Sequence, residues 1–167
     1  MSGRTSTAIT PSAYKGGSWC GIGTARTKRE VNLGTLFRSA ACLNADLVFT
    51  VGRRYTPQSS DTVKSWTHLP YVPYPDLDAF AASRPFDTPI IGVELTPDAR
   101  PLETFVHPRR ALYLLGPEDG SLSAAELALC SEVVAFSSSY CLNVAAAGTV
   151  VLYDRQAKAM QSQAVMS

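Results

Sequence analysis

The chain has 167 residues, 46% of them hydrophobic and 17% charged, which is enough for one domain with its own core and too little for two comfortable ones. Its four cysteines form no Cys-x-x-Cys pair and it has two histidines, so neither a disulfide framework nor a metal site is expected, and a reducing, cytoplasmic setting fits best. No apolar run is long enough to cross a membrane, and the start lacks the apolar segment of a secretory signal.

The net charge of +1 hides an uneven distribution of charge along the chain. Residues 1–64 carry nine lysines and arginines against three acids, so the remainder is acidic by five. A basic segment is often only a solvated face. Here, however, Arg26, Lys28 and Arg29 stand just before the first of three motifs, where a surface that follows phosphates would be useful. We therefore expect these three residues, together with Arg38, to bind RNA.

The predicted elements alternate between strands and helices. Residues 1–17 form a flexible arm, because Ser, Thr, Gly and Pro dominate there and bury little apolar surface. Strands are predicted at about 18–24, 46–52, 89–95, 111–116 and 132–137, and helices at about 33–44, 76–84, 123–130 and 142–160. Apolar strands interleaved with helices indicate an α/β fold, a parallel sheet covered on both faces. We expect a single domain at 18–160 and a short tail at 161–167.

Two local signals refine this prediction. Ser123 precedes a helical pattern that has Glu126 three positions later, the spacing of a reciprocal cap at a helix start. The segment 54–75 contains four prolines, which preclude a long regular helix, so we expect an irregular excursion there. Such a loop could contact substrate.

Three motifs stand where a predicted strand or loop gives way to a helix. The first is Asn32-Leu33-Gly34-Thr35-Leu36-Phe37-Arg38, which places Arg38 in the second turn of a helix that begins at or just after Asn32. The second, Leu114-Leu115-Gly116-Pro117-Glu118-Asp119-Gly120, leaves the carboxyl end of a buried strand, the edge where open α/β sheets bind ligands. The third, Phe136-Ser137-Ser138-Ser139-Tyr140-Cys141-Leu142-Asn143, enters the final helix, whose Ala145-Ala146-Ala147-Gly148 allows close packing.

Each motif also has an ordinary structural explanation. The first would suit any amphipathic helix with a solvated arginine, and the second would suit any tight turn. Asn143 has both a donor and an acceptor, so at a helix start it can tie two loops together or orient a nucleotide.

Together and in this order, the three motifs resemble the SpoU/TrmH-type RNA 2'-O-methyltransferases of the SPOUT superfamily, from about Gly21 to Tyr153. The resemblance implies transfer of a methyl group from S-adenosylmethionine to a ribose 2'-hydroxyl of structured RNA. It also implies that the last helix threads through a preceding loop in a deep trefoil knot, and that two copies form a homodimer that completes the target pocket. Sequence rules alone predict no knot.

The resemblance also assigns roles to residues. Arg38 is implied to activate the ribose hydroxyl or hold the adjacent phosphate, which suits its permanent cation better than the role of a general base. The implied catalytic residues are Arg38, Asn32, Glu118 and Asn143. The implied cofactor-binding residues, in loops at 93–96, 115–120 and 136–143, are Glu94, Leu115, Gly116, Phe136, Cys141 and Leu142.

Two other functions are alternatives to RNA methylation. A nucleotide-binding oxidoreductase is disfavoured because Gly21-Ile22-Gly23 lacks the third glycine of the dinucleotide fingerprint. A catalytically silent RNA-binding module is the main alternative, because Cys141 and Ser137 stand where many family members have serine and proline. Cys141 is not expected to be a nucleophile, since no histidine lies near it in sequence. The compact size favours tRNA over rRNA as substrate.

Overall fold

The computed structural model describes residues 18–56, 67–85, 88–138 and 140–166. The predicted arm at 1–17 lies outside the described residues, as does the stretch at 57–66. The strands are β1 (Trp19–Ala25), β2 (Leu47–Val51), β3 (Tyr71–Tyr74), β4 (Ile90–Val93), β5 (Arg100–Pro101), β6 (Arg110–Leu115) and β7 (Glu132–Ala135). The helices are α1 (Glu30–Cys42), α2 (Leu77–Ser83), the short 3-10 helix η4 (Leu102–Thr104), α3 (Ala124–Leu129) and α4 (Val144–Met166).

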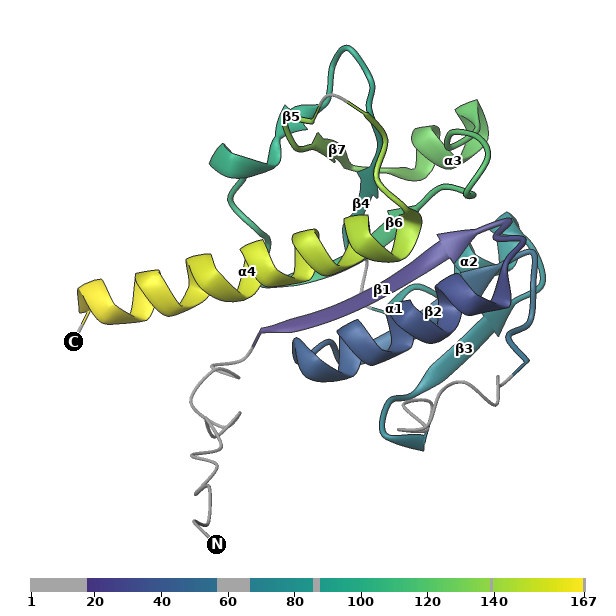
Figure 1. The fold of residues 1–167 in the computed structure, drawn as a ribbon, viewed down its shortest axis with the longest axis horizontal. Helices are drawn as coiled ribbons and strands as arrows, with labels where there is room; N and C mark the ends of the chain where they lie inside the picture. The colour runs from purple at the N-terminus through teal and green to yellow at the C-terminus, as the bar shows by residue number, and fades with distance from the viewer. Residues whose placement is uncertain (1–17, 57–66, 86–87, 139, 167) are drawn as a thin grey trace, which may run out of the picture.

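All seven strands join one parallel sheet in the order β3-β2-β1-β6-β4-β7-β5. The long strands β1 and β6 pair at its centre, with Trp19 opposite Arg110 and Thr24 opposite Leu115 (Figure 1). Because the strands are parallel, the loops that leave β1, β4, β6 and β7 emerge at the same edge of the sheet. The predicted α/β fold is confirmed.

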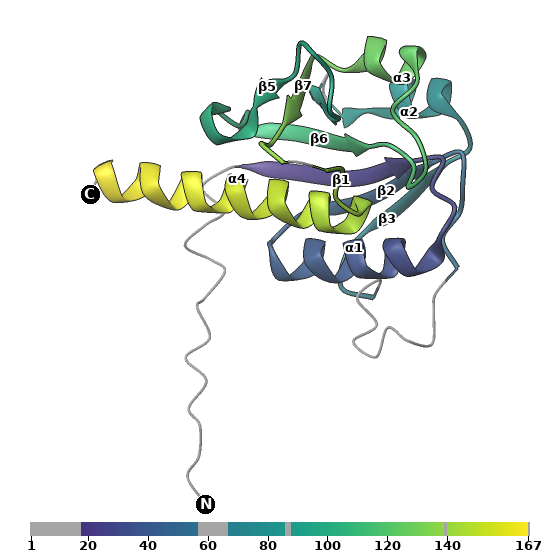
Figure 2. The same ribbon diagram turned by 45° about the horizontal axis from the view of Figure 1, so that its top comes forward.

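Helices cover both faces of the sheet, as predicted. Helices α1 and α4 lie on one face, and α2 and α3 lie on the other (Figure 2). Side chains alternate between two apolar cores, so in β6 Tyr113 packs in the core beneath α1 and α4, while Leu112 and Leu114 pack in the core of the opposite face. This period of two is what a strand buried on both faces requires.

Small residues allow α4 to approach α1 and β1 closely. A Cβ atom on Gly148 would lie 2.6 Å from Leu36 Cδ1 and 3.2 Å from Ile22 Cδ1, so no side chain fits at this position without rearrangement. The hydroxyl of the next residue, Thr149, donates to Ser39 Oγ at 2.7 Å, which joins α4 to α1. The close packing predicted from the Ala-rich start of the last helix is confirmed.

Both strands that the sequence did not predict lie at the edges of the sheet. Strand β3 falls in the segment 54–75, for which we predicted no regular element, and it contains Pro73; strand β5 ends at Pro101. Proline lacks a backbone N–H, so it is tolerated at an edge where one side of the strand needs no partner. The prediction of an irregular segment at 54–75 was therefore wrong for residues 71–74.

Two helices have different bounds from those predicted. Helix α1 begins at Glu30, so Asn32 lies in its first turn and Arg38 in its third turn rather than its second. Helix α4 extends to Met166, through most of the segment predicted as a tail. No helix among the described residues is both long and apolar enough to cross a membrane. The trefoil knot stays a prediction.

The buried Arg155 of α4 holds the segment that precedes β6. Its guanidinium donates to the backbone carbonyls of Pro108 at 2.7 Å and Arg109 at 2.9 Å, and to the Tyr113 hydroxyl at 3.1 Å. The Tyr113 hydroxyl also lies 2.6 Å from Nδ1 of His107, a side chain whose burial lowers its pKa. These hydrogen bonds among Arg155, Tyr113 and His107 anchor α4 to the sheet.

Candidate active site at the carboxyl edge of the sheet

The carboxylate of Glu118 is the centre of a hydrogen-bond network at the carboxyl edge of the sheet. Its Oε1 accepts from the Thr27 hydroxyl at 2.6 Å, the Arg29 backbone N–H at 3.1 Å and Asn32 Nδ2 at 2.8 Å. Its Oε2 accepts from the Lys28 backbone N–H at 2.9 Å. The loop after β6 thus satisfies the N–H groups at the start of α1, where Arg29 is the N-cap and offers no side-chain cap of its own.

These hydrogen bonds set the charge state of Glu118. Burial by itself would raise its pKa, but the bonds from Thr27, the Lys28 N–H and Asn32 outweigh it and lower the pKa to about 2. The positive end of the α1 dipole favours the same charge. Glu118 is therefore a fixed carboxylate at neutral pH, which suits it to hold the loops together and makes it a poor proton donor.

Asn32 extends the network to the final helix. Its Oδ1 accepts from Asn143 Nδ2 at 3.0 Å, while Asn143 Oδ1 accepts from the backbone N–H groups of Ala145 at 2.9 Å and Ala146 at 3.4 Å. Asn143 therefore caps α4 and at the same time bridges to α1. Three residues predicted as catalytic, Asn32, Glu118 and Asn143, are brought together across 111 residues of chain.

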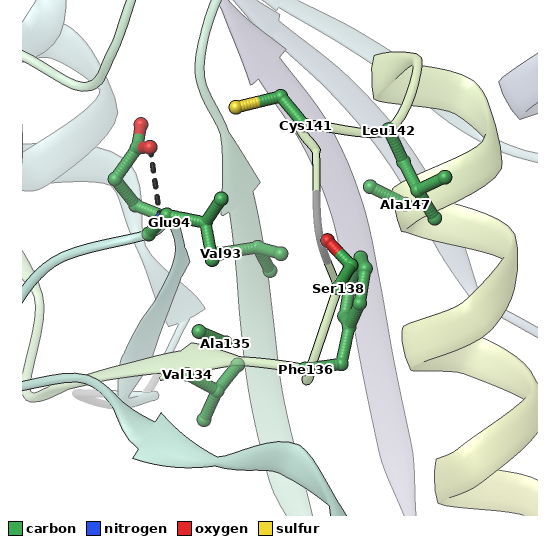
Figure 3. A pocket seen from close by; sticks show the side chains of 10 residues that line it. Val93, Glu94, Val134, Ala135, Phe136, Ser138, Cys141, Leu142 and Ala147 are labelled. Carbon is green, nitrogen blue, oxygen red and sulfur yellow. Dashed lines mark hydrogen bonds between the residues drawn. The ribbon is translucent and has the colours of Figure 1, made fainter.

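A pocket opens beside this network between the loops after β4 and β7 and the start of α4 (Figure 3). Its lining is mostly apolar. It contains four of the six residues predicted to bind the cofactor, Glu94, Phe136, Cys141 and Leu142. The remaining lining residues are Val93, Leu95, Val134, Ala135, Ser138 and Ala147. A lining with few polar groups suits a flat aromatic ring, with specificity left to backbone groups and Glu94.

Leu115 and Gly116 do not line the pocket. Leu115 is buried in the core beneath α1 and α4, so the structure gives it a packing role. Gly116 lies next to the pocket, since a Cβ atom there would be 3.1 Å from the Leu122 backbone nitrogen and 3.4 Å from Glu94 Oε2. Glu94 itself accepts from the backbone N–H groups of Leu95 at 2.9 Å and Leu122 at 2.8 Å. Glu94 therefore links the pocket to the Gly116 loop.

The four residues predicted to bind RNA occupy different environments. Arg26 is paired with Glu126, and Lys28 Nζ lies 2.7 Å from Asp119 Oδ2 in an exposed ion pair. Arg29 is exposed, and no side-chain partner is found for it among the described residues. Arg38 is also exposed and is not a member of the Glu118 network. Six residues of helix separate it from Asn32, a rise of about 9 Å.

Sequence reasoning missed the residue that fixes the start of α1 from the other side. Arg53, in the loop after β2, donates to the backbone carbonyls of Thr27 at 3.1 Å and Lys28 at 2.5 Å, and to Glu30 Oε1 at 2.7 Å. Because these contacts join segments that are distant along the chain, no local pattern signals them. In the sequence Arg53 is visible only as one of nine basic residues.

The motifs and the fold together match a known family. The profile of the SpoU rRNA Methylase family matches residues 22–153, which include all three motifs and the whole Glu118 network. The chain belongs to the SpoU rRNA Methylase family. No match is found among curated proteins.

Three solved structures of RNA-modifying proteins are similar to the fold of this chain. The SpoU methyltransferase AviRb from Streptomyces viridochromogenes, in complex with the cofactor AdoMet (S-adenosylmethionine), is 29% identical with a TM-score of 0.74; the match covers 86% of this chain and 62% of AviRb. The TrmH/SpoU tRNA modifying enzyme of A. aeolicus is 13% identical with a TM-score of 0.76, covering 86% and 77%. A protein studied for the 2-OH methylation of C/U34 on tRNA is 20% identical with a TM-score of 0.71, covering 90% and 96%. This chain thus spans less than two thirds of AviRb.

Family membership gives the site a chemical context. The third motif of this chain has Asn143, as expected, together with Cys141 and Ser137 in place of the usual serine and proline. Cys141 is exposed at the wall of the pocket. Among the described residues, no hydrogen bond between Cys141 and a histidine is found, and both ring nitrogens of His107 are taken by Tyr113 and Asp154. Within the described residues, no group of three or more His, Cys, Asp or Glu side chains could hold a metal ion.

Proposed function

We propose that the protein transfers a methyl group from S-adenosylmethionine to a ribose 2'-hydroxyl in structured RNA. The observation that carries this proposal is the chain of hydrogen bonds from Glu118 through Asn32 to Asn143, beside an apolar pocket, in a member of the SpoU rRNA Methylase family. The network joins the helix that carries Arg38 to the loops that line the pocket. Substrate and cofactor can therefore meet at this edge of the sheet.

The pocket fits the cofactor seen in AviRb. Val134, Phe136 and Leu142 offer apolar contacts for a purine, and Glu94 has acceptor oxygens for ribose hydroxyls. Gly116 has no side chain, so a ligand can come close to its backbone. A side chain at this position would meet Leu122 and Glu94. S-adenosylmethionine, when bound, supplies an electrophilic methyl group on a sulfonium, so the protein needs to provide position and charge rather than a covalent nucleophile.

Arg38 supplies the charge in this proposal. The 2'-oxygen takes the methyl group as its C–S bond to the sulfonium breaks; S-adenosylhomocysteine leaves, and the hydroxyl proton passes to solvent water. The Arg38 cation stabilises the negative charge that develops on the 2'-oxygen and neutralises the neighbouring phosphate. Lys28 and Arg29, near the start of the same helix, contact phosphates further along the strand. An exposed ion pair such as Lys28–Asp119 contributes little in water, so a phosphate can replace the carboxylate.

We favour tRNA over rRNA as the substrate. The support is the extent of the match: it covers 96% of the protein studied for the 2-OH methylation of C/U34 on tRNA, against 62% of AviRb. The family description names rRNA, and this is the competing substrate. Mapping 2'-O-methylation in RNA from cells with and without the protein distinguishes the two.

We also propose that two copies form a homodimer through the exposed face of α4. On this face Ala146, Val150, Tyr153, Ala157 and Met160 follow one another at spacings of four and three, the pattern of a helix-pairing seam. The side chains of Val150, Tyr153 and Met160 are 37%, 65% and 53% exposed, which is unusual for such a row in a monomer. We expect such a dimer to complete the target pocket across its interface.

Calorimetry with S-adenosylhomocysteine tests the placement of the cofactor. Gly116→Arg puts a long side chain against Leu122 and Glu94 and should abolish binding, whereas Gly120→Ala, where a Cβ comes no closer than 3.6 Å to Pro117, should bind as the wild type does. Undiminished affinity in a folded Gly116→Arg variant would count decisively against this pocket. The silent RNA-binding alternative predicts RNA binding without any transfer of label from S-adenosylmethionine.

A further inference from the structure

The guanidinium of Arg26 connects three segments that meet at the site. Its Nε donates to Glu126 Oε1 at 2.8 Å and its Nη2 donates to Glu126 Oε2 at 2.8 Å, a bidentate ion pair. The same Nη2 donates to the backbone carbonyl of Ser121 at 2.9 Å. Arg26 thus binds the loop that follows β6 and the start of α3 from its own position at the end of β1.

The partner of Arg26 is a buried carboxylate. Glu126 is only 4% exposed, and its Oε2 also accepts from the Ser123 backbone N–H at 2.6 Å, which completes the reciprocal cap of α3. The hydrogen bond from Arg26, followed by the cap, lowers the pKa of Glu126 despite its burial. If Arg26 turned away to a phosphate, this buried charge would lose its counterion, which is costly.

The backbone of Arg26 fixes the direction of its side chain. Arg26 has a φ of +52°, in the left-handed region that non-glycine residues seldom adopt. Its N–H donates to the Val51 carbonyl at 2.9 Å, which holds this conformation. Glycine would adopt the same backbone without strain, so what an arginine adds at this position is its side chain.

The contacts of Arg26 complete a clamp on the loop 116–122. Residues 27–29 hold one end of this loop through Glu118, and Arg26 holds the other end at Ser121. The next residue, Leu122, donates its N–H to Glu94 in the pocket wall. Movement at Ser121 is therefore transmitted to Glu94 through one peptide unit.

We infer that Arg26 is a positioning residue for the cofactor loop rather than a phosphate contact. This inference rests on the proposed function only in that the pocket binds S-adenosylmethionine. Arg26 keeps Ser121 and Leu122 in place, and through them Glu94, so that the pocket is formed before the cofactor arrives. Arg29, three residues later and exposed, is left to contact RNA.

Two variants remove the clamp from opposite sides. Arg26→Gly keeps the left-handed backbone and deletes the guanidinium. Glu126→Gln keeps an acceptor for the Ser123 N–H and deletes the ion pair. Both should weaken S-adenosylhomocysteine binding, by about two- to thirtyfold for a residue that acts through a contact network.

The second readout is the salt dependence of binding to bulk tRNA, with Arg29→Ala as the matched control. Arg29→Ala should lower the slope of log affinity against log salt by about 0.7 to 0.9 and leave S-adenosylhomocysteine affinity unchanged. Arg26→Gly should show the reverse pattern. Unchanged cofactor affinity in both clamp variants, or a reduced salt slope in Arg26→Gly, would overturn the inference. Neither readout requires methyl transfer, so a failure of the proposed ribose chemistry would leave this test intact.

Discussion

Single residues at this site are specialised by their hydrogen-bond partners more than by their type. Glu118 and Glu126 are both carboxylates at the carboxyl edge of the sheet, yet Glu118 serves the start of α1 and Glu126 serves the start of α3. Asn32 and Asn143 use both ends of their amides, so each joins two segments. Replacing any of them removes more than one contact.

Glu118→Gln should change how stability depends on pH. The folded pKa of Glu118 is lowered to about 2 from an ordinary value of 4.5, so its stabilising contribution is full above about pH 5 and is lost as the pH falls toward 2. The difference in free energy of unfolding between wild type and Glu118→Gln should shrink over this window. Denaturant unfolding at a series of pH values measures it, and a difference that stays constant from pH 7 to pH 2 would show that the hydrogen bonds do not favour the charged form.

Arg38→Ala should affect turnover far more than cofactor binding. Loss of a positioned cation that stabilises developing charge lowers the rate by about a hundredfold or more. Arg38→Lys should restore the rate only partly, because an ammonium lacks the planar fork of donors. Single-turnover methylation at saturating S-adenosylmethionine is the measurement. A near-normal rate in Arg38→Ala would remove this residue from the mechanism.

At the scale of elements, the sequence predicted the interior of the sheet and missed its edges. Strands β1, β2, β4 and β6 carry apolar runs because they are buried on both faces, and they were predicted together with the partly buried β7. Strands β3 and β5 are short and contain proline, so only tertiary pairing creates them. For the site, the Ser123–Glu126 cap was predicted because it is local, whereas the Arg26 and Arg53 contacts span the fold and leave no local pattern.

Gly23→Ala should destabilise the centre of the sheet. A Cβ atom there would lie 2.2 Å from the Phe49 carbonyl oxygen and 2.5 Å from its ring, and a backbone atom between two strands has little room to move. Overpacking of this kind costs about 1–3 kcal/mol. Thermal or denaturant unfolding tests it against Gly120→Ala, which meets no close atom. Equal stability of the two variants would contradict the packing described for β1 and β2.

At the scale of the whole molecule, the two loops that we assign to RNA and cofactor are held as one unit. The segment 26–29 contacts the loop 116–122 through Arg26, Thr27, Lys28 and Arg29, and Asn143 joins both to α4. We therefore expect a displacement of one loop to displace the other. The fold supplies this coupling, because parallel strands bring their carboxyl ends to one edge.

Tyr153→Glu should prevent the proposed dimer from forming. A charge in the middle of the apolar row on α4 would be buried without a partner in the helix pair. Sedimentation velocity should show a dimer for the wild type and a monomer for this variant. Ser162→Glu is the control and should remain a dimer, because Ser162 is also exposed but lies nine residues after Tyr153, on the opposite side of the same helix. A wild type that is monomeric at high concentration would rule out this interface.

Above all, we propose that this chain methylates a ribose 2'-hydroxyl of RNA. Incubation of the protein with labelled S-adenosylmethionine and bulk tRNA, followed by alkaline hydrolysis, tests it directly, because a 2'-O-methyl group blocks cleavage of the adjacent phosphodiester. We expect label in alkali-resistant dinucleotides for the wild type, and a large loss of that label for Arg38→Ala. Label recovered in mononucleotides, on the bases, or no label in tRNA or rRNA at any protein concentration, would contradict it.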